Sequence, residues 1–535
     1  MIQFNILHSL GILLALLTPH SLAPAAEEEL PNIVVIYTDD LGYGDLSCYN
    51  PKAKYQTPRI DKMAAEGILF TDAHSPSTIC SPSRYSLFSG QQIYRSTGRG
   101  GSAFEGPSGP SYLKPGTLTL GEMLREKGYR TSIFGKWHVG LTWLDKDGER
   151  LGGGYENSLL IDYEKSTPLV DGPNARGFDE SFVTPNCPTT DPLYLYIHNG
   201  MVVEPADRRH KRETLPNPGG KWRWDNDEGW RPPNYTFVGA DQLFYDKMKT
   251  FITDHRASKP RQPFFTVLST QICHAPVLPS PRFNDVTDAG PRGDFVAELD
   301  AIVGKTLDLL VEMGIDDNTI VMFNSDNGPE TVHTMWMRED HNHDAAGGWR
   351  GMKRDGWEGG HRVPFIARWP SRIPAGQVTD QMTNTTDIMA TLASVVGYEL
   401  PDDQATDSFD MLPVMIAKQD PEQSIRPHLL TQSFRGEFQL RVGDWKYLDH
   451  MGSGGNDYER HEDMRRYALP EKAPDAKGQL YDLGKDPGET TNLYFEEKSR
   501  REAMQGLLET LKKSGRSAPK NRAPIGMANI PVIKP

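Results

Sequence analysis

A continuous apolar run from Ile33 to Tyr37, followed at once by two aspartates, most constrains how this chain can fold. An apolar run without alternating polar residues is typical of a strand covered on both faces, as in a parallel sheet between helices. Comparable runs recur three times along the chain, at 131–134, 263–268 and 319–323. Helix-like segments at 57–67, 120–128 and 295–313 separate these runs. The alternation predicts an α/β domain with a mixed, mostly parallel sheet sandwiched by helices.

Polar side chains follow each of the four runs. They are Asp39, Asp40, Lys136, His138, His274, Asp326 and Asn327. Because ligands bind at the carboxyl ends of parallel strands, we expect these side chains to meet at one edge of the sheet. Each taken singly is also typical of a solvated turn, but their joint occurrence favours a site. The carboxylate and amide oxygens favour a hard cation, Ca²⁺ or Mg²⁺, over zinc.

The segment Cys80-Ser-Pro-Ser-Arg84 predicts a reactive centre at the start of a helix. Pro82 suits a first helical turn, and a spacing of four places Cys80 and Arg84 on one helix face. A helix N-terminus beside a guanidinium attracts anions. The alternative is a small core cysteine, because free cysteines are often buried.

This segment, followed by the small-residue turn Ser89-Gly90, resembles the signature of the type I sulfatases, which depend on formylglycine and belong to the alkaline phosphatase superfamily. In that family a formylglycine-generating enzyme converts the cysteine into an aldehyde whose hydrate supplies the nucleophilic oxygen. The resemblance covers the chain from about Asn32 to Tyr494. It implies an alkaline-phosphatase-like fold and hydrolysis of a sulfated saccharide or an aryl sulfate.

The resemblance also implies a role for individual residues. The ligands of a calcium ion, or of magnesium as the alternative, are expected to be Asp39, Asp40, Asp326, Asn327 and the modified Cys80.

A second set is implied to act on the sulfate ester. Lys136 and Lys353 are expected to hold the sulfate oxygens, and Arg84 is expected to orient the hydrated aldehyde. His138 is expected to handle the proton of the hydrate, and His274 to protonate the leaving alcohol.

Two other functions stay open at this point. A phosphodiesterase or phosphonate monoester hydrolase of the same superfamily would use a similar core. An inactive sugar-binding protein on the same fold would keep the metal, although a proton donor such as His274 would then serve no purpose.

The composition of the chain restricts which ligands and which disulfide bonds are expected. The formal net charge of −14 argues against non-specific nucleic-acid binding, so a local cationic cluster must attract an anionic substrate. The four cysteines, Cys48, Cys80, Cys187 and Cys273, are too few for a disulfide framework. If Cys80 is modified, the other three allow at most one bridge.

The chain divides into four predicted parts. Residues 1–25 are expected to be a signal peptide, because the apolar run Ile6–Leu17 precedes small residues. The run is too short for a membrane anchor, so the protein is expected to be exported, either periplasmic or secreted. A catalytic domain is predicted at 30–402, a smaller C-terminal α+β domain of antiparallel strands and a helix at 403–513, and an extended tail at 514–535.

Two segments, about 140–240 and 330–349, lack a regular pattern and are expected to be loops that carry substrate specificity. Their candidates for contacting a sugar are Trp222, Trp224, Trp230, His198, His333 and Trp349. Their aromatic content favours a pocket for one terminal sugar, that is, exo action on a carbohydrate.

Overall fold

The computed structural model describes residues 29–97, 109–152, 156–211, 227–520 and 522–533. The expected signal peptide at 1–25 lies outside the described residues, and so do Trp222 and Trp224. Within the described ranges, no helix combines the length and apolar character needed to cross a membrane.

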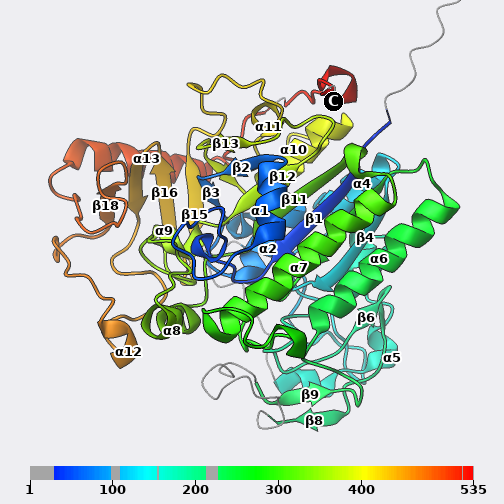
Figure 1. Cartoon of the computed structure of the whole chain (residues 1–535). Coiled ribbons are helices and arrows are strands. Elements are labelled where there is room, and N and C mark those ends of the chain that lie inside the picture. The colour runs from blue at the N-terminus through cyan, green and yellow to red at the C-terminus, as the bar shows by residue number, and fades with distance from the viewer. Residues whose placement is uncertain (1–28, 98–108, 153–155, 212–226, 521, 534–535) are drawn as a thin grey trace, which may run out of the picture.

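A ten-stranded mixed sheet runs through the centre of the larger part of the fold (Figure 1). Its strand order is β13-β2-β12-β11-β1-β10-β4-β5-β6-β7. The central strands β11, β1, β10, β4 and β5 all run parallel to one another. Their bounds are β1 Asn32–Thr38, β4 Arg130–Lys136, β5 Glu180–Thr184, β10 Phe264–Ser269 and β11 Thr319–Ser325.

The outer strands complete the sheet on both sides. Their bounds are β2 Ile68–Phe70, β12 Phe365–Arg368, β13 Gln377–Thr379, β6 Ile197–His198 and β7 Met201–Val202. Strand β12 is antiparallel to β11 and to β2, and β6 is antiparallel to β5. The sheet is therefore mixed but mostly parallel, as the sequence predicts.

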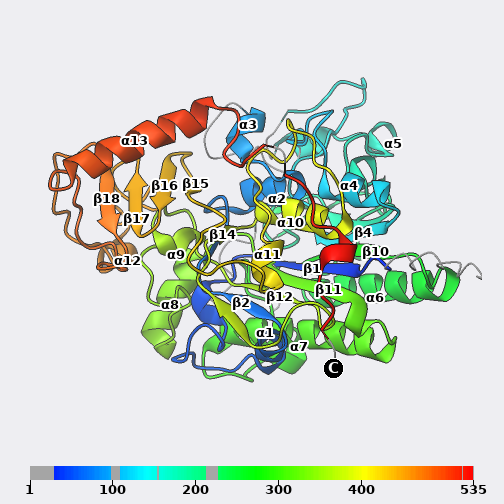
Figure 2. The same cartoon turned by 90° about the horizontal axis from the view of Figure 1, so that it is seen from above.

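Helices cover both faces of this sheet, as Figure 2 shows. Side chains Ile33, Val35 and Tyr37 of β1 pack into one core, whereas Val34 and Ile36 pack into another on the opposite face. The first core includes α2 (Cys80–Ser89), α4 (Leu120–Glu126) and α10 (Asp387–Val396). The second includes α1 (Pro58–Ala65), α6 (Ala240–Ser258) and α7 (Gly290–Glu312). The two cores explain why β1 carries apolar residues on both faces.

The local helix signals agree with these boundaries. Thr119 caps α4 by accepting a hydrogen bond from the Glu122 N–H, and the Glu122 carboxylate accepts one from the Thr119 N–H. Both predicted loop segments are wrong in part, because β5, β6 and β7 of the central sheet lie within 140–240 and α8 (Thr331–His341) occupies much of 330–349. This helix buries polar side chains such as His333 and Thr334, so it has no simple apolar period in the sequence.

A separate four-stranded antiparallel sheet lies near the C-terminus and confirms the predicted α+β architecture of that part. Its strands are β15 Leu429–Gln432, β16 Phe438–Val442, β17 Trp445–Leu448 and β18 Gln479–Asp482. Helix α13 (Lys498–Lys513) packs on it through Met504, Leu508 and Leu511. The chain then returns to the larger part, where Met527 and Ile530 join its first core. The exact domain boundaries stay a prediction.

Short α-helices and strands lie between these longer elements. The helices are α3 Ile93–Thr97, α5 Tyr163–Ser166, α9 Glu358–His361, α11 Leu412–Met415 and α12 Glu462–Arg465. The strands are β3 Ala73–His74, β8 Arg208–His210, β9 Gly229–Arg231 and β14 Thr383–Asn384.

A buried ionic cluster joins the C-terminal sheet to the larger part. The Nζ atom of Lys446 on β17 lies 3.0 Å from a carboxylate oxygen of Glu358 and 3.0 Å from one of Glu489. It also lies 3.1 Å from Nε2 of His361. Burial opposes ionisation of Glu358, but Lys446 and Arg362 outweigh it and hold the pKa of that carboxyl well below its ordinary value. Lys446 therefore holds α9 in place, and α9 follows the segment that carries Lys353.

Replacing Lys446 by methionine should destabilise the fold. The substitution leaves two buried carboxylates without their shared cation, which costs about 3 kcal/mol of unfolding free energy. Urea unfolding followed by fluorescence measures the shift in midpoint. Lys485→Met is the matched control, because the Lys485 side chain is 84% exposed. Equal midpoints for the two variants would show that the cluster is not stabilising.

Candidate active site

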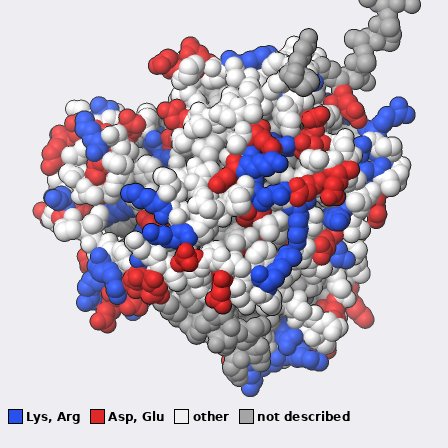
Figure 3. Space-filling model, viewed as in Figure 1, with Lys and Arg blue, Asp and Glu red and all other residues white. Residues whose placement is uncertain are grey.

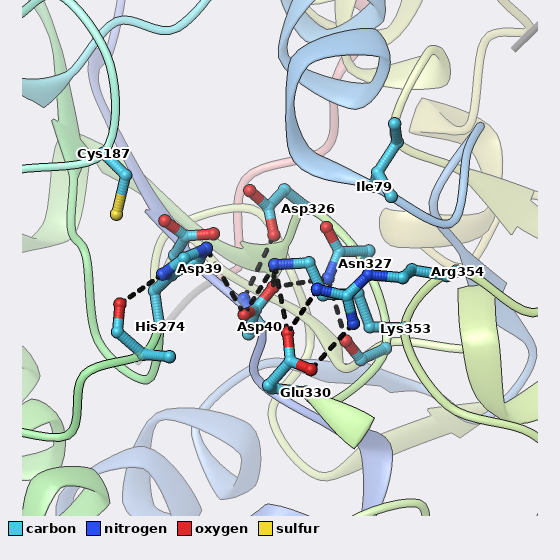
Figure 4. A network of polar contacts seen from close by, with 12 residues as sticks. Asp39, Asp40, Ile79, Cys187, His274, Asp326, Asn327, Glu330, Lys353 and Arg354 are labelled. Atoms are coloured by element: carbon cyan, nitrogen blue, oxygen red, sulfur yellow. Dashed lines mark hydrogen bonds and ion pairs between the residues drawn. The ribbon is translucent and has the colours of Figure 1, made fainter. Parts of the chain in front are cut away.

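Four central strands end at one edge of the sheet and deliver the polar residues that the sequence places after them. Asp39 and Asp40 follow β1, Lys136 ends β4, and Asp326 follows β11. His274 lies in the segment after β10. The structure brings these side chains together in one buried network, of which Figure 4 shows Asp39, Asp40, His274 and Asp326.

The acidic residues contact one another directly. The backbone N–H of Asp40 donates to a carboxylate oxygen of Asp326 at 3.1 Å, and Asn327 Nδ2 donates to Asp40 Oδ1 at 2.7 Å. Asp40 adopts a φ of 55°, in the left-handed region that non-glycine residues rarely occupy. Such backbone strain is typical of functional sites.

Each carboxylate of the cluster has a cationic partner. Lys136 Nζ lies 2.6 Å from Asp39 Oδ2, and Lys353 Nζ lies 2.8 Å from Asp40 Oδ2. Arg84 Nη2 lies 2.8 Å from a carboxylate oxygen of Asp326. Over the face drawn in Figure 3, by contrast, basic and acidic side chains are intermingled. The attraction for an anion therefore comes from these buried cations.

The donor set fits a hard divalent cation. Asp39 Oδ1 and Asn327 Oδ1 are buried and accept no hydrogen bond from the described residues. Buried oxygen atoms normally accept a hydrogen bond, so these two atoms are available to bind a cation. Burial and the neighbouring Asp39 raise the pKa of Asp326 to about 7, although Arg84 and Lys136 lower it in part. Asp39, Asp40, Asp326 and Asn327 could hold such a cation through oxygen.

Helix α2 places Cys80 beside this cluster. Cys80 is the first residue of the helix, and its Sγ lies within 4.8 Å of possible ligand atoms of Asp39, Asp40 and His274. Burial raises the pKa of the Cys80 thiol, although Lys136 and Lys353 lower it in part. The thiolate is the nucleophilic form of cysteine, so the unmodified side chain is a poor nucleophile here.

The surroundings of the two histidines of the site shift their pKa values in opposite directions. Burial, together with Lys136 and Arg84, lowers the pKa of His138 well below its ordinary value of 6.5. Burial also opposes charge on His274, but Cys187 and Asp40 outweigh it and hold the pKa of His274 well above 6.5. A neutral and a charged histidine at one site are suited to act as base and acid.

A cavity of about 270 Å³ opens over Cys80. Its lining residues are Ile79, Cys80, Ser81, His138, Cys187, Thr190, Asp191, Asp227, His274, Lys353, Arg354 and Phe434. The described sugar-contact candidates lie elsewhere, since the lining includes none of His198, Trp230, His333 and Trp349.

The sequence reasoning did not include two charged residues beside Lys353. Glu330 is fully buried and accepts hydrogen bonds from both terminal nitrogens of Arg354, at 2.7 and 3.1 Å. Arg354 adopts a φ of 84° and lines the cavity. The position of Glu330, four residues after Asp326, could have indicated it, but the backbone of Arg354 depends on tertiary contacts.

The family comparison decides the class of protein. A family model described as Sulfatase matches residues 31–398. The chain belongs to the sulfatase family. It is therefore an enzyme that hydrolyses sulfate esters.

Individual sulfatases resemble this one over most of their length. An N-acetylgalactosamine-6-O-sulfatase of Bacteroides thetaiotaomicron is 29% identical over 517 residues, which cover 90% of this chain and 93% of that protein. Human arylsulfatase A is 30% identical over 470 residues, covering 86% and 83%. A solved structure reported with the metabolism of multiple glycosaminoglycans by B. thetaiotaomicron superposes with a TM-score of 0.74 at 28% identity, covering 90% of this chain and 99% of that one.

The two buried oxygens that accept no hydrogen bond from the described residues, Asp39 Oδ1 and Asn327 Oδ1, predict tight binding of a divalent cation. Isothermal titration of chelator-treated protein with Ca²⁺ and then Mg²⁺ should show one ion bound per chain. Asn327→Ala should weaken binding at least about tenfold, because it removes an oxygen ligand. Asn318→Ala is the matched control, because Asn318 precedes β11 and lies at the opposite end of that strand from Asp326 and Asn327. Unchanged binding by Asn327→Ala would rule out this ligand set.

Proposed function

We propose that this sulfatase removes sulfate from a carbohydrate, using a formylglycine made from Cys80 and a calcium ion. The observation that carries the proposal is the position of Cys80, at a cavity wall beside Asp39, Asp40 and His274. Relatives named for N-acetylgalactosamine 6-sulfate support a sugar substrate and give the first compound to test.

Calcium is the ion that we propose for the acidic cluster. Asp39, Asp40, Asp326 and Asn327 would hold it, and carboxylates combined with an amide oxygen suit Ca²⁺. Bound there, it would supply positive charge next to the ester. Lys136 and Lys353, which now pair with Asp39 and Asp40, would then be available to sulfate oxygens.

The other roles in the reaction are assigned to side chains of this protein. The hydrated formylglycine would supply a nucleophilic oxygen and, through its second hydroxyl, a way to release sulfate. Neutral His138 would accept a proton at this position, and Arg84 would orient the group. Lys136 and Lys353 would donate hydrogen bonds to the sulfate oxygens where negative charge develops. Charged His274 would give its proton to the leaving alcohol.

The burial of Cys80 limits when the side chain could be converted to formylglycine. Its side chain is 6% exposed in the folded chain, and α2 packs into the core beneath the sheet. A maturing enzyme would therefore have to reach Cys80 before folding is complete. We also propose that the protein is exported, which the apolar run Ile6–Leu17 supports.

The role of His274 as proton donor can be tested with two substrates, one whose leaving group needs a proton and one whose leaving group does not. His274→Asn should reduce kcat/KM for a sugar sulfate by about 10²-fold or more, because a sugar alkoxide needs a proton to leave. The loss for 4-nitrophenyl sulfate should be much smaller, because nitrophenolate leaves without one. His138→Asn is the control, and it should slow both substrates alike. Equal losses for both substrates in His274→Asn would contradict the role of the acid.

The central experiment compares conversion of Cys80 with turnover. Protein made with and without a formylglycine-generating enzyme is digested, and the Cys80 peptide is weighed by mass spectrometry. Turnover should rise in proportion to the converted fraction, and unconverted protein should be about 10³-fold or more slower. Cys48→Ala should leave turnover unchanged, because Cys48 lies outside the cavity lining. Full turnover by unconverted protein would refute the proposal.

A further inference from the structure

Two oxygen atoms hold the His274 ring on its Nδ1 side. The Nδ1 atom lies 2.6 Å from the carbonyl oxygen of Ala275 and 3.2 Å from the hydroxyl oxygen of Thr190. The Thr190 hydroxyl also donates a hydrogen bond to that carbonyl oxygen, at 2.6 Å. Both His274 and Thr190 are buried. Thr190, from the segment after β5, is therefore in direct contact with the proposed acid.

The carbonyl group decides which ring nitrogen carries a proton. A carbonyl oxygen can only accept hydrogen bonds, so Nδ1 must donate to the Ala275 oxygen whether the His274 ring is neutral or charged. The Thr190 hydroxyl gives its own hydrogen to the same carbonyl, and its oxygen can accept from Nδ1 as well. The proton that His274 is able to release is therefore the one on Nε2.

The Nε2 atom lies on the side of the reacting groups. It is 3.8 Å from a carboxylate oxygen of Asp40, and His274 lines the cavity together with Cys80. Turning the ring by half a turn would place Nδ1 on this side and would lose its contacts with Ala275 and Thr190. The two contacts therefore favour the ring orientation that an acid at this cavity needs.

Thr190 is itself held in place by the surrounding loop. Its backbone carbonyl oxygen accepts hydrogen bonds from the Tyr194 hydroxyl at 3.0 Å and from the Asp227 backbone N–H at 3.2 Å. The branched side chain of threonine has few rotamers, so a fixed backbone also fixes the hydroxyl. The neighbouring Thr189 hydroxyl reaches the Ala275 oxygen only at 3.4 Å. Thr190 is therefore the closer of the two hydroxyls that support this carbonyl.

We propose that Thr190 is a positioning residue for His274: its hydroxyl, through Nδ1 and the Ala275 carbonyl, orients the ring so that Nε2 delivers the proton. This inference rests on the proposed role of His274 as the acid. As the sulfur passes to the nucleophile, the bond between sulfur and the leaving oxygen breaks and its electron pair stays on that oxygen. The oxygen takes the Nε2 proton, and the ring is left neutral with its other proton on Nδ1.

The test compares three substrates with the mature, metal-loaded enzyme: 4-nitrophenyl sulfate, phenyl sulfate and N-acetylgalactosamine 6-sulfate. Their leaving groups become more basic in this order and depend increasingly on an acid. Thr190→Val keeps the shape of the side chain but lacks the hydroxyl. It should lower kcat/KM about tenfold for the sugar sulfate, about fivefold for phenyl sulfate and less than about twofold for 4-nitrophenyl sulfate. Thr190→Ser restores the hydroxyl and should stay within about twofold of wild type on all three.

Controls separate positioning from other roles of the residue. Thr306→Val is the matched control, because Thr306 is buried and its hydroxyl donates to the Ile302 carbonyl oxygen within α7, at 3.0 Å. It should leave all three substrates unaffected. Thr190→Ala should repeat the pattern of Thr190→Val, and it replaces that variant if valine prevents folding. Equal losses on all three substrates would indicate a merely structural role, and a loss confined to the sugar sulfate would indicate contact with the sugar; either result overturns the inference.

Measuring His274→Asn on the same substrates separates this inference from the function on which it rests. A loss in His274→Asn that grows with the basicity of the leaving group, without such a loss in Thr190→Val, overturns the role of Thr190 alone. Equal losses in His274→Asn overturn the acid and the inference together. Turnover of both aryl sulfates without turnover of the sugar overturns the sugar substrate alone, because the aryl pair still tests Thr190.

Discussion

The burial of Asp39, Asp40 and Asp326 at one edge of the sheet is the constraint on which the site depends. All three residues are fully buried, and ionised carboxylates in such a place are unstable unless cations compensate them. The protein supplies Lys136, Lys353 and Arg84 as partners, yet two oxygen atoms still accept no hydrogen bond within the described chain. The site is therefore arranged for a bound cation, after which the lysines can turn to an anionic substrate.

The C-terminal part contributes to this site as well as to stability. The Thr78 N–H, two residues before the start of α2, donates to the Gln432 carbonyl oxygen at 3.0 Å. Phe434 reaches the cavity from the next loop, and Lys446 holds α9 after the segment of Lys353. The two parts therefore fix the cavity from both sides. A change in the packing of the small sheet should be felt at Cys80 and Lys353, although both belong to the larger part.

The strands β1, β4, β10 and β11 and the polar edge at their ends could be predicted because their signals are local, whereas β5 lies in a segment that was expected to be loops. A buried parallel strand needs a continuous apolar run, as in Ile33–Tyr37, and the residues after it must lie at the carboxyl edge. The cavity wall could not be predicted, because Asp191 lies in a segment without periodicity. That loop is shaped by contacts such as the Tyr235 hydroxyl donating to the Pro188 carbonyl oxygen at 2.6 Å. The position of Phe434 at the cavity could not be predicted either, because Phe434 lies between β15 and β16 of the C-terminal sheet.

Anomalous diffraction from calcium-loaded crystals tests the central claim most directly. The account predicts a calcium peak between Asp39, Asp40, Asp326 and Asn327, bonded to the two oxygens that now accept no hydrogen bond. Lys136 and Lys353 should then point towards the cavity instead of pairing with Asp39 and Asp40. Crystals that take up calcium elsewhere, or that leave both lysine–aspartate pairs intact with no peak between the carboxylates, would contradict it.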